Sequence, residues 1–222
     1  MPRSASSRSR KPRRPGRPAE GAGEHRERLL DAALACFTRA SIASTPLAAI
    51  AREAGVTPAL VHYYFDDKAA LVQALAAERL LPAMAGLRDA IGGSDDDAGA
   101  LARAFVAGIH ALVARNPWLP SIWVREILTE GGALREMMVA QGGAGVPRAM
   151  AARLAQASGG LPAGVDPRLL VVSLVGLTLF PLASQPLWRQ FLDAGDVDAA
   201  RLQSHTLALL GHGLETSDAS SH

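Results

Sequence analysis

The sequence has very little cysteine, which limits the kinds of protein it can be. Cys36 is the one cysteine among 222 residues, so an intramolecular disulfide is excluded. A reducing cytoplasm is therefore the expected setting. Cys36 lies beside the apolar stripe of a predicted helix, with no adjacent basic group in the sequence to lower its pKa. We expect a packed thiol rather than a redox sensor.

Sequence signatures of catalysis are also missing. The chain contains no GxSxG, HExxH, Walker or dinucleotide-binding pattern. Its six histidines do not show metal-ligand spacing near acids or cysteine, and Ser173 and Ser184 have no evident base. We expect no catalytic residue, no metal and no cofactor. An enzyme stays open as the alternative from a different class.

Clear alternation of apolar and polar residues, the pattern of a half-buried strand, is missing as well. Long apolar segments with helical spacing predict an all-α protein instead. A chain of 222 residues suits one or two domains and can bury a sizeable core.

Charge is distributed unevenly along the chain. The net charge of +2 hides a charge of +6 on residues 1–20, which leaves −4 on the remainder. The segment RSRKPRRPGRPA has too few apolar residues to fold and too many prolines for a helix, so residues 1–22 are predicted to be a disordered arm. No apolar segment follows the arginines, as a secretory signal would need. The arm is either a solvated tail or a DNA-binding element whose Arg14 and Arg17 reach a minor groove.

Residues 47–68, LAAIAREAGVTPALVHYYFDDK, carry the strongest local pattern in the chain. Leu47, Ile50, Ala51 and Ala54 form the single apolar stripe of a short helix. Gly55 supplies the left-handed backbone of a helix end, and Thr57 with Pro58 provides an N-cap and a first turn for the next helix. Two helices joined by a tight turn are therefore predicted.

The second of these helices has an unusual outward face. Val61 and Phe65 are spaced to point inward, whereas Leu60, His62 and Tyr63 point outward and Tyr64 lies near the edge. A preceding helix has its own apolar stripe, made of Leu30, Ala33, Leu34 and Phe37. Three such helices make a small DNA-reading domain over residues 23–70. The alternative is a partly buried aromatic helix in an ordinary bundle.

The segment HRERLLDAALACFTRASIASTPLAAIAREAGVTPALVHYYFDDKAALVQAL resembles the N-terminal domain of TetR/AcrR-family transcriptional regulators. The specific parts are AAL..F, IA..AGV, YYF and DDKAAL. His62 stands where most members have tyrosine, and ASIASTP lacks the glycine common in relatives. The resemblance implies that the major groove is contacted by Thr57, Ala59, Leu60, His62 and Tyr63. It implies that phosphates are held by Thr45, Tyr64 and Lys68, and Pro58 is also expected in the DNA-binding set.

Downstream, residues 71–215 are predicted to form a larger helical effector-binding and dimerisation domain, and residues 216–222 a disordered tail. A fourth helix starts after the cap residue Asp67, and Pro82 is expected to interrupt it with a kink near Leu81. Further helices are predicted near residues 98–115, 118–129 and 132–157, the last broken by glycines and Pro147. Asp166 and Pro167 begin a strongly apolar helix, and a final helix covers about residues 197–214.

Residues 169–188 contain no charged side chain, which raises a transmembrane alternative. Their most apolar part spans only ~22 Å as a helix, short of the ~30 Å hydrocarbon core of a bilayer. A helix buried on all sides is the simpler interpretation. The family resemblance implies that the last two long helices pair with a second copy, through Leu170, Leu174, Leu177, Leu202, Leu209 and Leu210.

The second domain offers aromatic, methionine and polar residues as candidates for an effector pocket, although such residues also fill simple cores. The candidates are Phe105, Trp123, Met137 and Phe180, with His110, Glu126 and Gln141 as polar handles. We expect a cytoplasmic, bacterial homodimer that represses transcription from a palindromic operator until a lipophilic or aromatic small molecule releases it. Activation stays open, as does an effector-independent DNA-binding or partner-recruiting factor.

Overall fold

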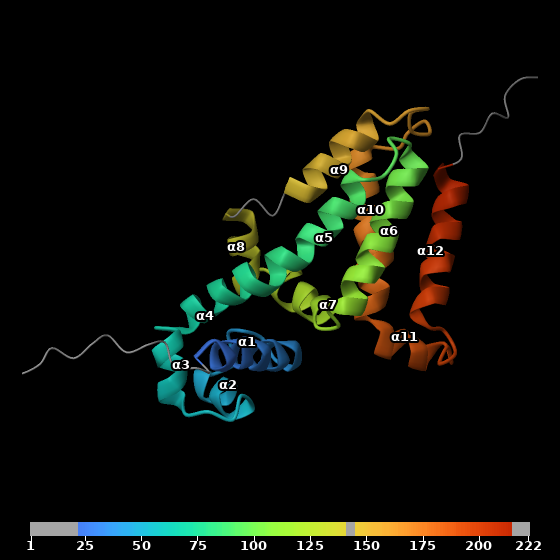
Figure 1. The fold of residues 1–222 in the computed structure, drawn as a ribbon. Coiled ribbons are helices and arrows are strands. Elements are labelled where there is room, and N and C mark those ends of the chain that lie inside the picture. Colours follow the sequence, from blue (N-terminus) through green and yellow to red (C-terminus); the bar gives the residue numbers. More distant parts are fainter. Residues whose placement is uncertain (1–21, 141–144, 215–222) are drawn as a thin grey trace, which may run out of the picture.

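The computed structural model describes residues 22–140 and 145–214, and their regular structure is helical. The predicted all-α class is confirmed. Helices α1 (Ala22–Arg39), α2 (Leu47–Glu53) and α3 (Pro58–Tyr64) form a small N-terminal domain. Figure 1 shows this domain at the lower end of the molecule, with the longer helices of the second domain above it.

The three N-terminal helices pack through the apolar stripes that the sequence predicts. Leu30, Leu34 and Phe37 of α1 are buried, as are Ile50 of α2 and Val61 of α3. Each stripe repeats at three and four residues, so it lies along one face of its helix and meets the others at a common centre. This core holds α3 at the surface of the domain.

A continuous helical connector joins the two domains. It consists of α4 (Lys68–Leu75), the π-helical segment η1 (Ala76–Leu80) and α5 (Leu81–Gly92). Helical structure continues through Pro82, from Lys68 to Gly92, and the kink predicted near Leu81 stays a prediction. The irregularity is the wide π turn one turn earlier, where the carbonyl of Glu78, which would face the missing N–H of Pro82, accepts from the Arg79 guanidinium at 3.4 Å.

Asp67 caps the start of this connector, as the sequence predicts. Its Oδ1 accepts a hydrogen bond of 2.8 Å from the backbone N–H of Ala70. We expect Asp67→Ala to lower the free energy of unfolding by ~1 kcal/mol, because one N–H group of the first turn loses its partner. Denaturant unfolding measures this loss. The exposed neighbour provides the control, since Asp66→Ala should stay within about 0.5 kcal/mol of the parent; equal losses in the two variants would contradict the capping role.

The second domain is built around α6 (Ala98–Arg115), the helix predicted for residues 98–115. This helix packs against α5, α10 (Pro167–Ala183) and α12 (Ala199–Leu214). In Figure 1, α6, α10 and α12 stand nearly parallel, and α5 runs obliquely up toward the upper end of α6. The Asp166 side chain caps α10 as predicted, accepting from the Arg168 N–H at 2.8 Å.

The remaining helices are short. Segments α7 (Leu119–Ile122) and η2 (Trp123–Leu128) occupy the stretch predicted as one helix over residues 118–129. The helix predicted for residues 132–157 is two helices, α8 (Ala133–Ala140) and α9 (Gly145–Ala155), since the glycines between them disfavour a continuous helix. Helix α11 (Gln185–Phe191) was not predicted.

Apolar helices of the second domain are long enough to raise the membrane question again. By length and composition, Lys68–Gly92 and Ala98–Arg115 pass as membrane spans, and α10 with α11 passes as a pair bent by 74°. The bend begins at Ser184, so the apolar stretch that the sequence singled out is not one straight helix. Packing of α6 among α5, α10 and α12 accounts for its apolar character as core.

Cys36 is buried, in agreement with the predicted packed thiol. Desolvation raises the pKa of the thiol above its ordinary value of 9.0, although the Arg39 guanidinium lies 3.8 Å from Sγ and opposes the shift. A thiol held neutral in this way is a poor nucleophile.

Several predictions concern parts of the chain outside the described residues. These are most of the predicted arm, including Arg14 and Arg17, the tail of residues 216–222, and Gln141. The predicted domain boundary at residue 70 falls inside α4.

Candidate nucleic-acid interface

The turn between α2 and α3 has the geometry of a helix-turn-helix. Gly55 has a φ of +66°, the left-handed conformation that a side chain would strain. The N–H of Val56 then donates to the carbonyl of Ala51 at 2.9 Å, which closes the end of α2. Residues 55–57 thus reverse the chain within a few residues and let α3 cross α2 over a shared core.

Helix α3 presents a largely exposed face to solvent. Its exposed members are Thr57, Pro58, Ala59, His62 and Tyr63, whereas Leu60 is half-buried. The Tyr63 side chain has 77% of its surface exposed, and its ring meets that of Tyr64 edge to face at 5.1 Å. The structure therefore brings the predicted major-groove residues together on one side of α3, with Tyr64 steadying the exposed tyrosine.

Lys68 stands where α4 begins, beside the connection between α1 and α2. Its Nζ donates to the carbonyl of Ala43 at 3.0 Å. An ammonium has three donors, so this bond leaves others available for a phosphate oxygen.

Two predicted roles do not match the local geometry. Thr57 is the N-cap residue of α3 and Pro58 lies in its first turn, as predicted, but the Thr57 side chain makes no capping hydrogen bond. Thr45 is only 4% exposed, and its hydroxyl donates to the Ser41 carbonyl at 2.8 Å, which does not favour a phosphate contact. The carbonyl of Ser41 thus competes with a phosphate for the Thr45 hydroxyl, and the sequence alone does not show this competition.

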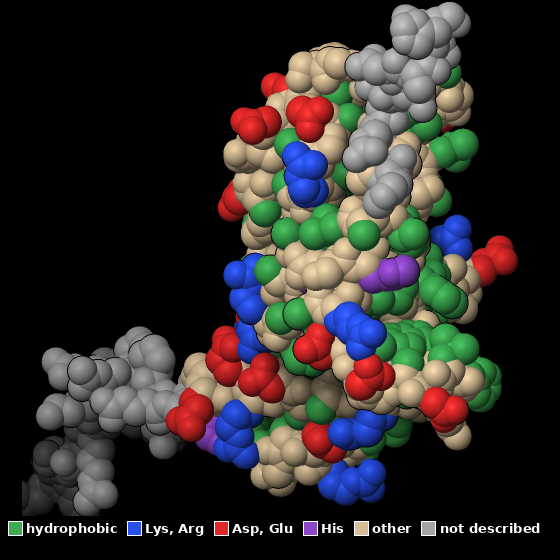
Figure 2. Space-filling view, turned by 90° about the vertical axis from the view of Figure 1, so that its right-hand side faces the viewer, with side chains coloured by type: hydrophobic (Ala, Val, Ile, Leu, Met, Phe, Trp, Pro, Cys, Tyr) green, Lys and Arg blue, Asp and Glu red, His purple; other side chains and the backbone are tan. Residues whose placement is uncertain are grey.

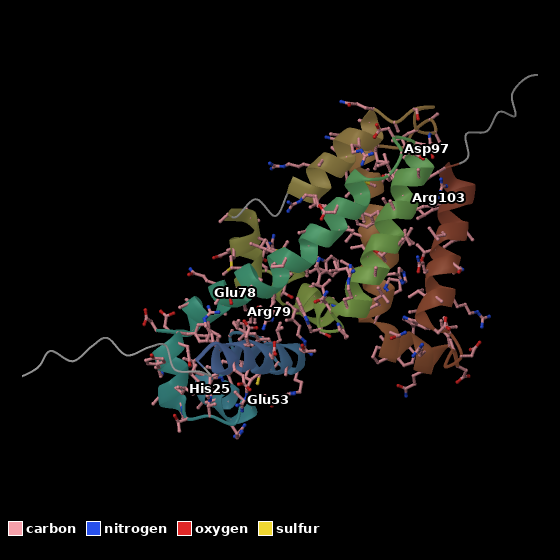
Figure 3. The ribbon with its side chains drawn as sticks, viewed as in Figure 1. His25, Glu53, Glu78, Arg79, Asp97 and Arg103 are labelled. Carbon is pink, nitrogen blue, oxygen red and sulfur yellow. The ribbon has the colours of Figure 1, made fainter. Side chains whose placement is uncertain are left out.

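Charged residues of α1 form ion pairs with the connector and so hold the N-terminal domain against it. The Arg26 guanidinium pairs with Glu78 of η1 through two hydrogen bonds, one of them 2.6 Å long. Arg79 pairs with Glu27 and with Asp31, the latter at 3.0 Å. Figure 3 shows Glu78 and Arg79 where the connector passes over α1. The Arg26 guanidinium holds the pKa of the Glu78 carboxyl below its ordinary value of 4.5.

Two further arginines of α1 bond to the end of α2, and the apolar pattern of the sequence does not indicate these contacts. Arg28 donates to the carbonyl of Ala54 at 2.7 Å, and Arg39 pairs with Glu53 at 2.6 Å. Two side chains of α1 therefore bond to the end of α2. Sequence reasoning missed Arg28 and Glu53, since it assigned polar positions only to a solvated face. The pairs join residues far apart in sequence, which periodicity does not report.

The predicted effector residues that the structure describes lie on several helices. Phe105 and His110 are buried on α6, and Trp123 and Met137 are half-buried on η2 and α8. Phe180, the other predicted aromatic, is 66% exposed on α10. Glu126 is buried, and both of its carboxylate oxygens already accept backbone N–H groups.

His110 is the predicted polar handle that the structure supports best. Its side chain is only 8% exposed, and Nε2 is buried without a hydrogen-bond partner in the described residues. Desolvation therefore lowers the pKa of the imidazole from its ordinary 6.5, because the charged form is disfavoured. A buried imidazole nitrogen without a partner is a group that a ligand hydroxyl or amide would satisfy.

This shift predicts a pH dependence of folding. The unfolded chain takes up a proton near pH 6.5 more readily than the folded protein, so stability is present above that pH and is lost as the pH falls. We expect the unfolding temperature to drop between about pH 7.5 and about pH 5.5, and to drop less in His110→Leu. The exposed His205 gives the control variant, His205→Asn; a parent-like drop in His110→Leu would refute the assignment.

Leucines predicted at a dimer interface lie mostly inside the protomer. Four of the predicted interface leucines are buried within the protomer, which corrects the prediction for them: Leu170, Leu174, Leu202 and Leu210. Leu177 is half-buried and Leu209 is exposed. Exposed apolar residues of α10 are instead Leu169, Val172 and Phe180. Their spacing of three and eight residues places them along a single side of the helix.

An apolar cavity of about 410 Å³ lies between α10, α11 and α12. Leu177, Trp188, Leu192 and Leu209 line it, together with Arg201 and His205. Figure 2, which views the molecule from the α12 side, shows hydrophobic side chains gathered on the surface at the height of α11. The exposed apolar residues of α11 and its C-cap are Leu187, Phe191 and Leu192.

Within residues 22–140 and 145–214, no three His, Cys, Asp or Glu side chains gather as a metal site requires. The exposed face of α3, the tight turn and the lysine at α4 together give this part of the chain the geometry of a helix-turn-helix, a motif typical of DNA-binding proteins.

Comparison with known families agrees. The model for bacterial regulatory proteins of the tetR family matches residues 29–75. The HTH-type transcriptional regulator SrpR of Pseudomonas putida is 41% identical over 64 residues, which cover 29% of this chain and 30% of SrpR. The HTH-type transcriptional regulator TtgR of the same species is 44% identical over 59 residues, covering 27% and 28%. The chain therefore matches less than a third of the length of these curated relatives.

Solved structures extend the likeness to the whole fold. The transcriptional regulator FadR of Bacillus subtilis, solved in complex with stearoyl-CoA, has a TM-score of 0.62 at 19% identity, over 85% of this chain and 99% of that chain. A putative fatty acid metabolism regulator of Clostridium perfringens gives 0.65 at 17% identity, over 84% and 98%. Residues 29–75 are thus similar to the DNA-binding part of tetR-family regulators, and the whole chain shares the fold of these solved regulators.

Proposed function

We propose that the protein is a dimeric repressor that binds a palindromic operator through α3 and leaves it when a lipophilic small molecule occupies the second domain. The observation that carries the DNA-binding part is the exposed face of α3 next to Lys68, held on a rigid three-helix core. Side chains of this kind meet base edges and thymine methyl groups in a major groove, while the lysine meets a phosphate. We place the protein in the cytoplasm, where its DNA is.

Dimerisation is proposed through α10 and α12. Leu169, Val172 and Phe180 leave an apolar stripe of α10 in contact with water, and Leu209 adds to it from α12. Covering such a stripe with the same stripe of a second copy gives a two-fold interface. Two reading helices related by that axis would then contact two half-sites one helical turn apart.

Selection of bound fragments from genomic DNA tests the DNA-binding proposal. Purified protein is mixed with sheared DNA and excess nonspecific competitor at fixed salt, and the retained fragments are sequenced. We expect the fragments to share an inverted repeat. Retention without any common sequence would reduce the interaction to nonspecific phosphate attraction, as the basic residues 1–20 alone would give.

The effector proposed is a molecule with a long apolar part and a single polar group. His110 supports this choice, because Nε2 is buried on α6 and has no hydrogen-bond partner in the part of the chain that the structure describes. The structural neighbour solved with stearoyl-CoA supports the lipid-like class. An effector that favours a conformer with wrongly spaced reading helices would appear as weaker operator affinity.

Titration with stearoyl-CoA, free stearate and an aromatic panel tests the effector proposal. Tryptophan fluorescence reports binding, and anisotropy of the labelled operator fragment reports release. We expect at least one lipophilic compound to release DNA from the parent protein, and His110→Phe to weaken that response. Binding of none of these compounds would favour the effector-independent regulator.

A further inference from the structure

Glu126 is a buried carboxylate that links the second domain to the DNA-binding domain. It lies in η2 and is only 2% exposed. Its Oε1 accepts the N–H of Ile42 at 2.8 Å, and its Oε2 accepts the N–H of Ala133 at 3.3 Å. None of the ion pairs within the described residues includes Glu126. Its charge is therefore stabilised by backbone donors, and such charge-assisted bonds are strong and costly to break.

Ile42 belongs to the connection between α1 and α2, residues 40–46, which lies beside the start of α4. The next residue, Ala43, accepts the hydrogen bond from Lys68 at 3.0 Å. Glu126 and Lys68 thus hold adjacent residues of one short segment, the first from the second domain and the other from the start of α4. A displacement of Glu126 would move the carbonyl that positions the Lys68 ammonium.

The local backbone is built to place this carboxylate. A side chain at position 132 would collide with the backbone carbonyl of Glu126, so only glycine allows the chain to return and bring Ala133 to Oε2. Glu126 lies on the π-helical segment η2, and Glu78 and Arg79, which pair with α1, lie on the π-helical segment η1. Both π segments therefore bear groups that bond to the N-terminal domain, and π turns are frequent at functional sites.

We infer that Glu126 is a positioning residue for DNA binding, which fixes residues 41–43 and through them the Lys68 ammonium in the orientation that meets a phosphate. The inference rests on the proposed DNA-binding function. It assigns to Glu126 a role between the domains in place of the effector contact expected from the sequence.

The test compares operator affinity in Glu126→Ala, Lys68→Ala and the double variant, measured by anisotropy with the selected fragment. We expect Glu126→Ala to weaken binding on the order of tenfold, because the buried N–H of Ile42 loses its acceptor. The double variant should bind little more weakly than Lys68→Ala, since the two changes act through one contact. Glu130→Ala, which removes an exposed carboxylate four residues later, is the matched control and should bind like the parent.

Hydrogen exchange of the free proteins provides a readout that is independent of DNA. Glu126→Ala should speed exchange of the Ile42 amide and its neighbours while the core of α3 keeps its protection. Additive losses of affinity, or faster exchange throughout the domain, would show a merely structural role and overturn the inference. Unchanged exchange at Ile42 would overturn it as well. A parent protein that selects no operator would overturn the proposed function instead, and the exchange data would still show whether Glu126 holds the segment.

Discussion

Tyr63→Ala binds the selected operator at least about tenfold more weakly than the parent and discriminates less between matched and mismatched half-sites. The side chain is largely exposed on α3, and its visible partner is the edge of the Tyr64 ring. Its removal therefore costs little folding free energy, whereas it takes a large contact surface away from the groove. Anisotropy titrations on operator and mutated operator fragments measure both effects.

Lys68→Ala distinguishes a phosphate contact from a base contact in the same assay. Loss of one phosphate contact weakens binding to all sequences alike and lowers the slope of log affinity against log salt by ~1. The matched control is Arg88→Ala, which removes an exposed cation from α5. If Tyr63→Ala kept full affinity and specificity, α3 would not be the reading helix.

Val172→Asp abolishes dimer formation at micromolar concentration and, with it, lowers operator affinity by about a hundredfold or more. Val172 lies in the exposed apolar stripe of α10 between Leu169 and Phe180. A carboxylate at the centre of an apolar interface would lose its hydration without gaining a partner, once from each subunit. A monomer presents a single reading helix, which loses the contacts of the second half-site.

Sedimentation velocity and the operator titration together measure this effect. Val139→Asp supplies the control, because Val139 is also an exposed valine but lies on α8. The control should remain dimeric and bind operator like the parent. A Val172→Asp protein that stays dimeric would place the interface on another surface, such as α11 with its exposed Leu187 and Phe191.

The N-terminal domain was predictable because its signals are local. The stripe of Leu30, Leu34 and Phe37 repeats every three or four residues, and Gly55 marks the turn directly. In α10 the same reasoning fails, because nearly every residue is apolar and no period separates Leu170 from Leu169. The structure buries the first and exposes the second.

Contacts between distant segments were the other gap. Sequence reasoning treated Glu126 as a free polar handle, since nothing near it in the chain indicates a partner 84 residues away. The π turns that position Glu78 and Glu126 also have no composition signal, and Pro82 indicated a kink near Leu81 without indicating the π turn that precedes it. Packing between elements decides these features, and a single sequence does not report it.

Hydroxyl-radical footprinting of the parent protein on a selected fragment tests the central claim most directly, because it maps where the protein meets the DNA backbone. Two protected patches, related by a two-fold axis and separated by about one helical turn on one face of the duplex, are the predicted result. They should disappear together in Tyr63→Ala. Uniform weak protection, or protection that survives in Tyr63→Ala, would contradict the account of α3 as the reading helix of a dimer.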